Sequence, residues 1–269
     1  HHHSRQWRGC RKRHRELREA RLLTREVTVA GLSGLSGLSG LTGIAGGAAA
    51  WTPASLSSLT AWFDPSYGTY SDAGTTPAVV GDTVYHWVSR NSGSIYAQQA
   101  TLARRPIYDG TYITGDGVND IIVVPQFQLT SAMTGNCTVV AVVKRLAYGV
   151  YNSVHATTSG EYRAFRFTNG NASQTLSNLT NLNGPSVTDA TKHIIASCYD
   201  HTNSLLKQSF DGAAYTTQAW TPEGGDLNFA MFSRYDDGLP LNGNLQALIV
   251  CDSVLSIEDV GLLKTYFGL

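Results

Sequence analysis

The chain has 269 residues, of which 42% are hydrophobic and 15% are charged, and its formal net charge is zero. No apolar run approaches the roughly 18 residues that a membrane-spanning helix needs, and no charged segment leads into an apolar one as in a signal peptide. We therefore expect neither a membrane segment nor a membrane partner. The 27 glycines and 13 tyrosines on a weakly charged chain are typical of a protein built from strands and turns.

The first 26 residues are strongly basic. They contain nine Arg or Lys and three Glu, so they carry a charge of +6 and leave −6 on the remainder of the chain. Apolar residues at helical spacing from Leu17 to Val27 predict a helix here. We interpret residues 1–30 as an arm that anchors the chain to a partner, with a solvated helix face as the alternative. The near absence of aromatic residues argues against a nucleic-acid partner. The predicted anchoring residues are Arg8, Arg11, Lys12, Arg13, Arg15 and Arg18.

Glycine occupies every third position from Gly31 to Gly46, and an aliphatic residue follows each of the first five. A period of three fits an extended polyproline-II-like path, whose backbone groups need partners from other chains. We therefore predict that residues 31–50 form a stem that joins copies of the chain into a homo-oligomer, with a trimer expected. A flexible Gly/Ser linker is the alternative, and the absence of proline argues against true collagen. The predicted oligomer contacts are Gly31, Leu32, Gly34, Leu35, Gly37, Leu38, Gly40, Leu41 and Gly43.

The sequence pattern changes at Trp51, where short apolar runs begin to alternate with turns. This pattern predicts an all-β domain over residues 51–269, an antiparallel β-sandwich with a short C-terminal helix. Ser256, followed by two acidic residues, predicts the cap of that helix. Its apolar face is expected to comprise Leu262, Leu263, Tyr266 and Phe267. The predicted strands are 62–64, 83–89, 121–124, 138–143, 162–167, 193–199, 204–210, 227–232 and 245–251.

Some residues in this domain carry structural expectations of their own. Asp211-Gly212 predicts a type I′ turn, because glycine tolerates a positive φ at low cost. Trp62 and Trp87 lie among alternating apolar residues, so we expect both to fill the space between two sheets. The four cysteines show no metal-binding spacing, and three of them lie in apolar runs. Buried free thiols are therefore expected at Cys137, Cys198 and Cys251.

Seven motifs follow one another along this domain. They are Pro53-x-x-Leu56 with 61–64, Gly81-Asp82 with 87–93, 103–108, Gly115-Asp116-Gly117-Val118-Asn119-Asp120, 137–144, Phe210-Asp211-Gly212, and 241–250 running into 255–259. In this order they resemble a concanavalin A-like lectin/glucanase domain of the LamG type, as found in phage virion and bacterial surface proteins. Gly115 stands where the family usually has an aromatic residue, and Gln246-Ala247 replaces its usual Ala-Glu pair. The resemblance covers about residues 51–269 and implies a lectin-like jelly roll.

The acidic residues argue against catalysis. Glucanases of this fold carry carboxylates two positions apart on one strand, so that the carboxylates share a face. Here the acidic residues are scattered over turns, and no nucleophile elbow or phosphate-binding loop is present. We predict that the protein is not an enzyme and needs no cofactor. Calcium bound at the rim by Asp116, Asp120, Asp236, Asp237 or Asn242 is the alternative to aspartates that only stabilise turns, and we predict no metal site.

Carbohydrate binding calls for exposed aromatic rings beside polar side chains, because a sugar stacks its apolar face and hydrogen-bonds through its edge. Segments 148–152 and 233–237 combine both features best. Tyrosines that cover a sandwich surface or a subunit interface are the alternative interpretation. The predicted carbohydrate-binding residues are Tyr148, Tyr151, Asn152, Arg234, Tyr235 and Asp236, and further aromatic candidates in turns are Tyr67, Tyr70, Tyr96, Tyr112 and Trp220.

An anchoring arm, an oligomerising stem and a lectin-like head together describe an appendage on a particle. The sequence predicts a structural protein exposed on a phage virion, either a capsid decoration or a fibre protein. Its arm would bind a capsid or tail protein, and its head would bind host or environmental glycans through avidity. A carbohydrate-binding adhesin module on a bacterial cell surface is the alternative, and an unusual glycoside hydrolase is a third, less favoured interpretation.

Overall fold

The computed structural model describes residues 50–125, 129, 134–147, 151–157, 163–169, 172–177, 180–222, 228–234 and 238–269. The chain divides into two units, 1–49 and 50–269, and every described residue belongs to the second. The predicted arm lies outside the described residues, as does the predicted stem apart from Ala50. The account of the fold therefore concerns the predicted head.

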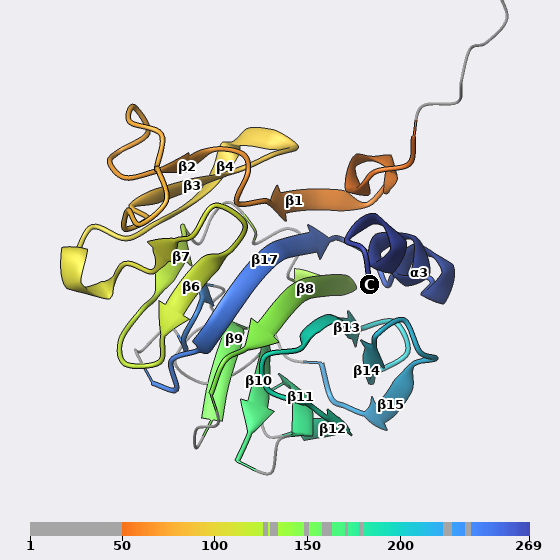
Figure 1. Ribbon diagram of the computed structural model, residues 1–269. Helices are drawn as coiled ribbons and strands as arrows, with labels where there is room; N and C mark the ends of the chain where they lie inside the picture. Colours follow the sequence, from red (N-terminus) through yellow and green to blue (C-terminus); the bar gives the residue numbers. More distant parts are fainter. Residues whose placement is uncertain are drawn as a thin grey trace, which may run out of the picture. The chain divides into compact units, whose positions relative to one another are not determined.

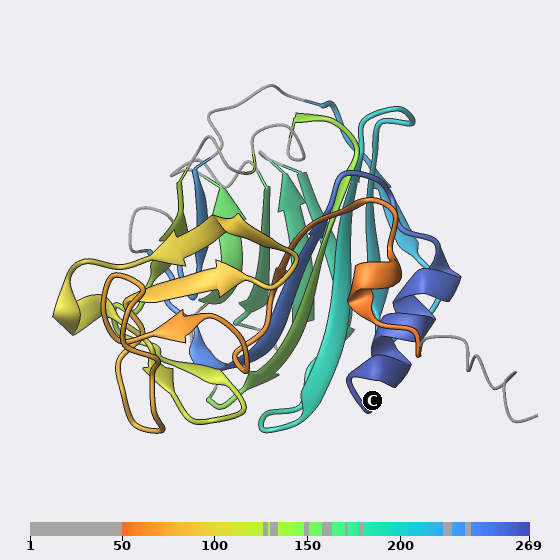
Figure 2. The same cartoon turned by 90° about the horizontal axis from the view of Figure 1, so that it is seen from above.

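Two antiparallel sheets pack face to face, which confirms the predicted β-sandwich (Figures 1 and 2). Sheet A has the spatial order β15-β14-β13-β8-β17-β6-β5, and β1 also pairs with β17. Its strands are β1 (Leu59–Phe63), β5 (Ile107–Tyr108), β6 (Ile113–Asp116), β8 (Cys137–Arg145), β13 (Lys192–Asp200), β14 (Leu205–Phe210), β15 (Thr216–Ala219) and β17 (Asn242–Cys251).

Sheet B has nine strands in the order β12-β11-β10-β9-β16-β7-β4-β3-β2. These are β2 (Thr69–Tyr70), β3 (His86–Ser89), β4 (Ser92–Gln98), β7 (Ile122–Val124), β9 (Tyr151–Thr157), β10 (Arg163–Thr168), β11 (Ala172–Ser177), β12 (Thr180–Ser186) and β16 (Phe229–Met231). The short 3-10 helix η2 (Leu102–Arg104) lies between β4 and β5 in the chain.

A third layer covers the outer face of sheet A. It consists of α3 (Ile257–Tyr266) and the 3-10 helix η1 (Pro53–Ser55), which lie side by side in Figure 2. Sheet A is thus buried on both faces: one core cluster fills the space between the sheets, and a second lies under α3. This burial explains the uninterrupted apolar runs at 139–143 in β8 and 247–251 in β17, which do not alternate.

The C-terminal helix begins as the sequence predicts, but its buried face differs from the predicted one. The Ser256 side chain accepts a hydrogen bond from the backbone N–H of Asp259, which confirms the cap. Leu262 and Tyr266 are 42% and 39% exposed, so their assignment to the apolar face was wrong in part. A helix lying on a flat sheet buries one stripe at i, i+3 and i+7. That stripe consists of Val260, Leu263 and Phe267.

The two tryptophans have different surroundings. Trp87 is completely buried between the sheets, as predicted, and its indole nitrogen donates to the carbonyl oxygen of Asp64 at 3.2 Å. Trp62 is also buried, but it lies in the cluster beneath α3, so its predicted place between the sheets was wrong. Its neighbours on β1, Ala61 and Phe63, face the inter-sheet core. Alternation along the strand therefore turns Trp62 towards the helix.

Local backbone chemistry explains two further sequence features. Asp211 and Gly212 have φ values of 52° and 74°, which confirms the predicted type I′ turn. Gly115 replaces the aromatic residue usual in the resembled family because a Cβ there would lie 2.5 Å from the carbonyl oxygen of Leu241. The predicted buried thiols are confirmed at Cys137, Cys198 and Cys251, which are buried and not joined in disulfides.

The sequence analysis did not predict eight of the strands: β2, β4, β5, β6, β9, β11, β12 and β15. Several of them are rich in Ser, Thr, Asn and Gln, which weakens the hydrophobic alternation that reveals a strand. In β11 the polar side chains are nevertheless buried, because they bond across the sandwich. Thr175 lies 2.8 Å from the Ser197 hydroxyl and accepts a hydrogen bond from the Gln208 amide at 3.1 Å.

Candidate functional site

Described residues that follow the two predicted sugar-binding segments pair with each other at one end of sheet B. The backbone N–H of Ser153 donates to the carbonyl oxygen of Leu239 at 2.8 Å, which joins the start of β9 to the chain that follows β16. Arg234 is half-buried in that following segment. Asn152 is only 2% exposed, and its side-chain oxygen accepts the backbone N–H of Asn242 at 2.9 Å. The structure therefore places Asn152 inside the sandwich, away from solvent.

The remaining residues of that predicted set lie outside the described structure. These are Tyr148, Tyr235 and Asp236 in full, and the side chain of Tyr151. Of the further aromatic candidates, Trp220 was wrongly expected to be exposed, because it is 5% exposed within the inter-sheet core. Tyr70 and Tyr96 are half-exposed, and they lie close together on another part of sheet B.

That part is the outer face of β2, β3, β4 and β7. Strand register aligns Tyr70 with His86, His86 with Gln98, and Gln98 with Val123. Side chains directly opposite each other in neighbouring strands share a face and lie in contact range. Trp87 and Ala97, the sequence neighbours of this row, point into the core. The row itself therefore faces outward.

Aromatic rings surround His86 on this face. Its ring is tilted by 31° against that of Tyr96 with centroids 4.7 Å apart, and its centroid lies 6.1 Å from that of Tyr70. Partial burial lowers the pKa of His86, and the nearby negative charge of Asp72 opposes this only in part. Hydrogen bonds from Thr75 and Thr76 hold the pKa of Asp72 itself well below its usual range. At neutral pH the cluster thus presents an uncharged imidazole between two phenols.

A cavity of about 480 Å³ opens beside this aromatic cluster. Gln98, Arg104 and Asn228 supply polar groups, and Val123 and Pro125 supply an apolar wall. Arg104 ends η2, and Asn228 immediately precedes β16, so the wall combines two loops with a strand face. We call the surface made by Tyr70, His86, Tyr96 and these five lining residues the sheet-B groove.

A buried amide fixes the shape of this groove. Gln99 is 8% exposed, and its side-chain nitrogen donates to the carbonyl oxygen of Ile121 at 3.1 Å. Its side-chain oxygen accepts the backbone N–H of Thr101 at 2.9 Å. The end of β4 is thereby tied both to the start of β7 and to the loop that leads to Arg104. Because these groups are held in place, little ordering is required when a ligand binds.

The chemistry of the groove suits recognition better than catalysis. Amide side chains both donate and accept hydrogen bonds, aromatic rings offer flat apolar faces, and Arg104 adds a positive charge. The described residues that line the cavity include no carboxylate, and therefore no pair of carboxylic groups for glycoside hydrolysis. Within the described part of the chain no group of three or more His, Cys, Asp or Glu residues is arranged to hold a metal ion. No helix of that part is long and apolar enough to cross a membrane.

Comparison with known proteins yields a likeness of fold. The sequence matches none of the protein-family models and none of the curated proteins with which it was compared. The sialidase of Trypanosoma rangeli in complex with 2,3-difluorosialic acid is 12% identical with a TM-score of 0.59, over 80% of this chain and 34% of the sialidase. The same sialidase in complex with sialic acid gives a TM-score of 0.57 at 12% identity, over 78% and 33%. This chain therefore spans about a third of the enzyme's length.

A smaller solved structure is also similar. The CBM40 of the Ruminococcus gnavus IT-sialidase, bound to α2,3 sialyllactose, is 17% identical with a TM-score of 0.45, over 59% of this chain and 94% of its own. At this level of identity, the sialidase and this chain share the fold alone. The described domain is accordingly an antiparallel β-sandwich with the fold of the matching part of the sialidase.

The sequence analysis missed six residues of the groove: His86, Gln98, Arg104, Val123, Pro125 and Asn228. A signal existed for His86, because the alternation around Trp87 places its neighbour on the opposite face. For Gln98 and Asn228 the sequence holds no such signal. They lie 130 positions apart and meet only because β7 pairs with both β4 and β16.

Proposed function

We propose that the described domain is a non-catalytic carbohydrate-binding head of the LamG type, and that the sheet-B groove is its glycan site. One observation carries the proposal: a row of half-exposed aromatic rings leads directly into a cavity lined by two amides, an arginine and an apolar wall. A sugar ring needs this combination, since its apolar face stacks while its hydroxyls both donate and accept.

The length of the groove favours an oligosaccharide over a single sugar. Tyr70, His86, Gln98 and Val123 stand on four successive strands, and neighbouring strands are about 4.8 Å apart. Such a row accommodates two to three linked sugar units, roughly 5 Å each at this spacing. Sialylated glycans belong among the test ligands because the similar solved structures include a sialidase with sialic acid and a CBM40 with α2,3 sialyllactose.

The wider proposal concerns the whole chain. We propose that the basic arm anchors the protein to a capsid or tail protein, that the glycine-triplet stem joins several copies, and that the heads are displayed on a phage virion. The charge of +6 on the first 26 residues and the uninterrupted period of three support this proposal. Weak glycan sites on several heads of one stem would gain affinity from simultaneous binding.

A glycan array probed with the full chain tests the head. We expect binding to at least one glycan, and a loss of about tenfold for Gln98→Ala and for Asn228→Ala, since each removes a hydrogen-bonding group worth about 1.4 kcal/mol. Gln218→Ala is the matched control, because Gln218 is an exposed amide on β15 at the edge of sheet A. Equal losses in all three variants, or no binding to any glycan, would contradict the proposal.

Two further measurements address the other parts. Incubation with the glycans that bind should release no product. Measurable hydrolysis would favour the glycoside hydrolase interpretation over the non-catalytic proposal. Particles from a phage preparation should retain the full chain and lose a variant without residues 1–30. Recovery of the chain from bacterial cell envelopes in place of particles would favour the adhesin alternative.

A further inference from the structure

Sheet A contains a gap beside β17. Two strands share the same edge of β17: β6 pairs with Asn242 to Leu245, and β1 pairs with Leu248 to Cys251. Neither strand pairs with Gln246 or Ala247. The register of β17 against β8 also shifts between Leu245 and Ala247, so Gln246 is the extra residue of a β-bulge. Bulges redirect side chains and are frequent at functional sites.

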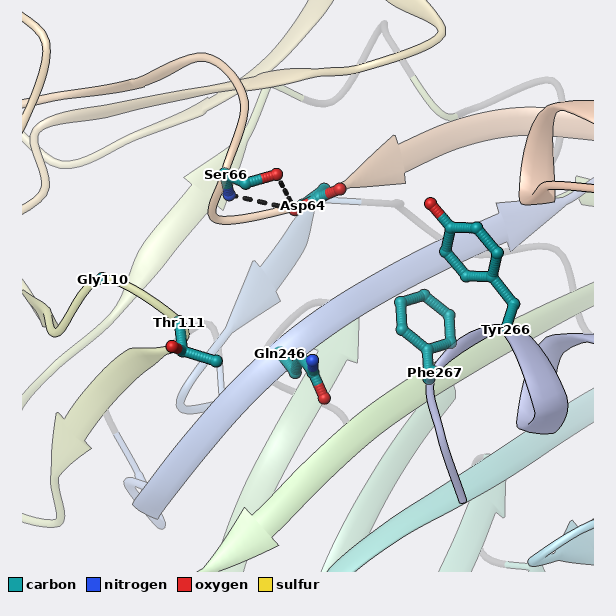
Figure 3. Close-up of a pocket in the computed structure, with 7 residues that line it drawn as sticks. All are labelled: Asp64, Ser66, Gly110, Thr111, Gln246, Tyr266 and Phe267. Carbon is teal, nitrogen blue, oxygen red and sulfur yellow. Dashed lines mark hydrogen bonds between the residues drawn. The ribbon is translucent and has the colours of Figure 1, made fainter.

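A pocket of about 300 Å³ lies over this gap. Figure 3 shows its walls: Asp64 and Ser66 follow the end of β1, Thr111 precedes β6, and Gln246 forms the floor. Tyr266 and Phe267, from the end of α3, close the remaining side. The pocket thus lies on the outer face of sheet A, on the opposite side of the sandwich from the sheet-B groove.

The floor of the pocket carries an unsatisfied acceptor. The side-chain oxygen Oε1 of Gln246 is buried and has no hydrogen-bond partner among the described residues. A buried carbonyl without a donor costs free energy, so native structures retain one mainly where something else satisfies it. Oε1 itself is closed off from solvent, so a hydroxyl or N–H of a ligand would supply the missing donor once the Gln246 amide turns Oε1 into the pocket.

Aromatic rings make the apolar side, and they are held firmly. Tyr266 makes edge-on contacts with Trp62 at 5.9 Å, Trp51 at 6.4 Å and Phe267 at 5.0 Å between centroids. The carbonyl oxygen of Phe267 accepts a hydrogen bond from Lys192 at 2.7 Å. Tyr266 remains 39% exposed despite these contacts, so its ring is both fixed and accessible. This combination suits stacking against the apolar face of a ring-shaped ligand.

The charges around the pocket select a neutral ligand. The Asp64 carboxylate is already neutralised by Arg90 at 2.9 Å and accepts the backbone N–H and the hydroxyl of Ser66. Because Arg90 offsets the charge of Asp64, the pocket lining offers no free counter-charge to an ammonium group or to an anion. Uncharged hydroxyls, in contrast, can bond to Gln246, Thr111 and Ser66 without an electrostatic cost.

We propose that this pocket, which we call the helix-side pocket, binds one neutral pyranose ring. The apolar face of the sugar lies against Tyr266 and Phe267, and one of its hydroxyls donates to Oε1 of Gln246. The head then carries two independent sugar sites on opposite faces of the sandwich. The proposal stands on the pocket's own chemistry and does not depend on glycan binding in the sheet-B groove.

Side-chain amide NMR on the full chain tests the proposal directly. The probes are the methyl glycosides of glucose, galactose, mannose and N-acetylglucosamine, each titrated to millimolar concentration. We expect at least one of them to shift the side-chain amide signals of Gln246. Gln246→Leu and Tyr266→Ala should each weaken that glycoside's binding about tenfold, whereas Gln98→Ala in the sheet-B groove should leave it unchanged.

The melting temperature of the sugar-free variants separates a ligand role from a structural one. Gln246→Leu removes the unsatisfied carbonyl, so we expect its melting temperature to equal or exceed that of the wild type. A clear decrease would mean that Gln246 stabilises the bulge and would count against the proposal. Unshifted Gln246 signals with all four glycosides, or unchanged affinity in Gln246→Leu, would overturn it. Loss of oligosaccharide binding in Gln98→Ala tests only the proposed site in the sheet-B groove, not the helix-side pocket.

Discussion

At the scale of single residues, buried polar groups shape the interior of this sandwich. Arg163 is 2% exposed, and its guanidinium lies 3.2 Å from the sulfur of Cys137 and 5.2 Å from the ring centre of Tyr199. Arg145 is equally buried and reaches Asp189 at 2.5 Å. Replacing Arg163 by alanine would leave the buried sulfur of Cys137 without this partner, whereas the side chain of Asp189 is 40% exposed and can be solvated without Arg145.

Asp120 provides a pH-dependent test of this polar interior. Burial raises its pKa from 3.8 to about 6, although the backbone N–H of Asp116 opposes the shift. In the folded state the carboxyl therefore keeps a proton that the unfolded chain releases at lower pH. We expect this residue to reduce the free energy of unfolding by about 3 kcal/mol as the pH rises from roughly 4 to 7, with no further change above that window.

Urea unfolding of the wild type and of Asp120→Asn across this range measures the effect. Asparagine can accept the same backbone N–H without ionising, so the variant should gain stability relative to the wild type as the pH rises. The difference between the two proteins isolates Asp120 from the other groups that titrate in the same range. Parallel stability profiles would show that the buried carboxyl does not have a raised pKa.

At the scale of elements, α3 determines how much of sheet A is shielded. Val260, Leu263 and Phe267 cover Ile194, Ile249 and neighbouring side chains on the outer face of the sheet. The Ser256 cap fixes where the helix begins, and Lys264 donates to the carbonyl oxygen of Asp211 at 2.9 Å. That contact ties the last turn of the helix to the type I′ turn after β14. The same helix end supplies Tyr266 and Phe267 to the helix-side pocket.

A pair of substitutions in α3 should change stability in opposite directions. Ser256→Ala removes a side chain that bonds to the N–H of Asp259, and we expect a loss of about 1 kcal/mol. Gly261→Ala introduces a Cβ with no heavy atom within 4 Å in the helix interior, and we expect a gain of about 0.5–1 kcal/mol. Chemical denaturation measures both. A destabilising Gly261→Ala would show that the glycine is needed for packing.

At the scale of the whole molecule, the question is how several heads are held together. The described head has its own core and needs no partner strand to complete either sheet. The proposed oligomer therefore depends on the stem. We expect residues 27–269 to form a trimer and residues 51–269 to be monomeric, because the shorter chain lacks the glycine triplets. Light scattering coupled to size-exclusion chromatography distinguishes the two, and an identical oligomer for both chains would exclude the stem as its cause.

Local features were predictable because each depends on a few adjacent residues. The cap at Ser256, the turn at Asp211-Gly212 and the burial of Trp87 all follow from the chemistry of short segments. The alternation of apolar runs with turns was likewise enough to predict a sandwich. Polar strands such as β11 and β12 were missed, because their burial depends on partners in other strands that a local pattern does not reveal.

The sequence by itself thus determined the fold class and several turns and caps. The division into arm, stem and head stays a prediction. The tertiary structure alone decided where the two proposed sites lie. Asp64, Gln246 and Tyr266 are separated by up to 202 positions, and they converge because β1 and β6 leave a gap along β17. Gln98 and Asn228 meet through the register of three strands. Periodicity and turn chemistry act over neighbouring residues, whereas a binding site depends on long-range pairing that only the folded chain specifies.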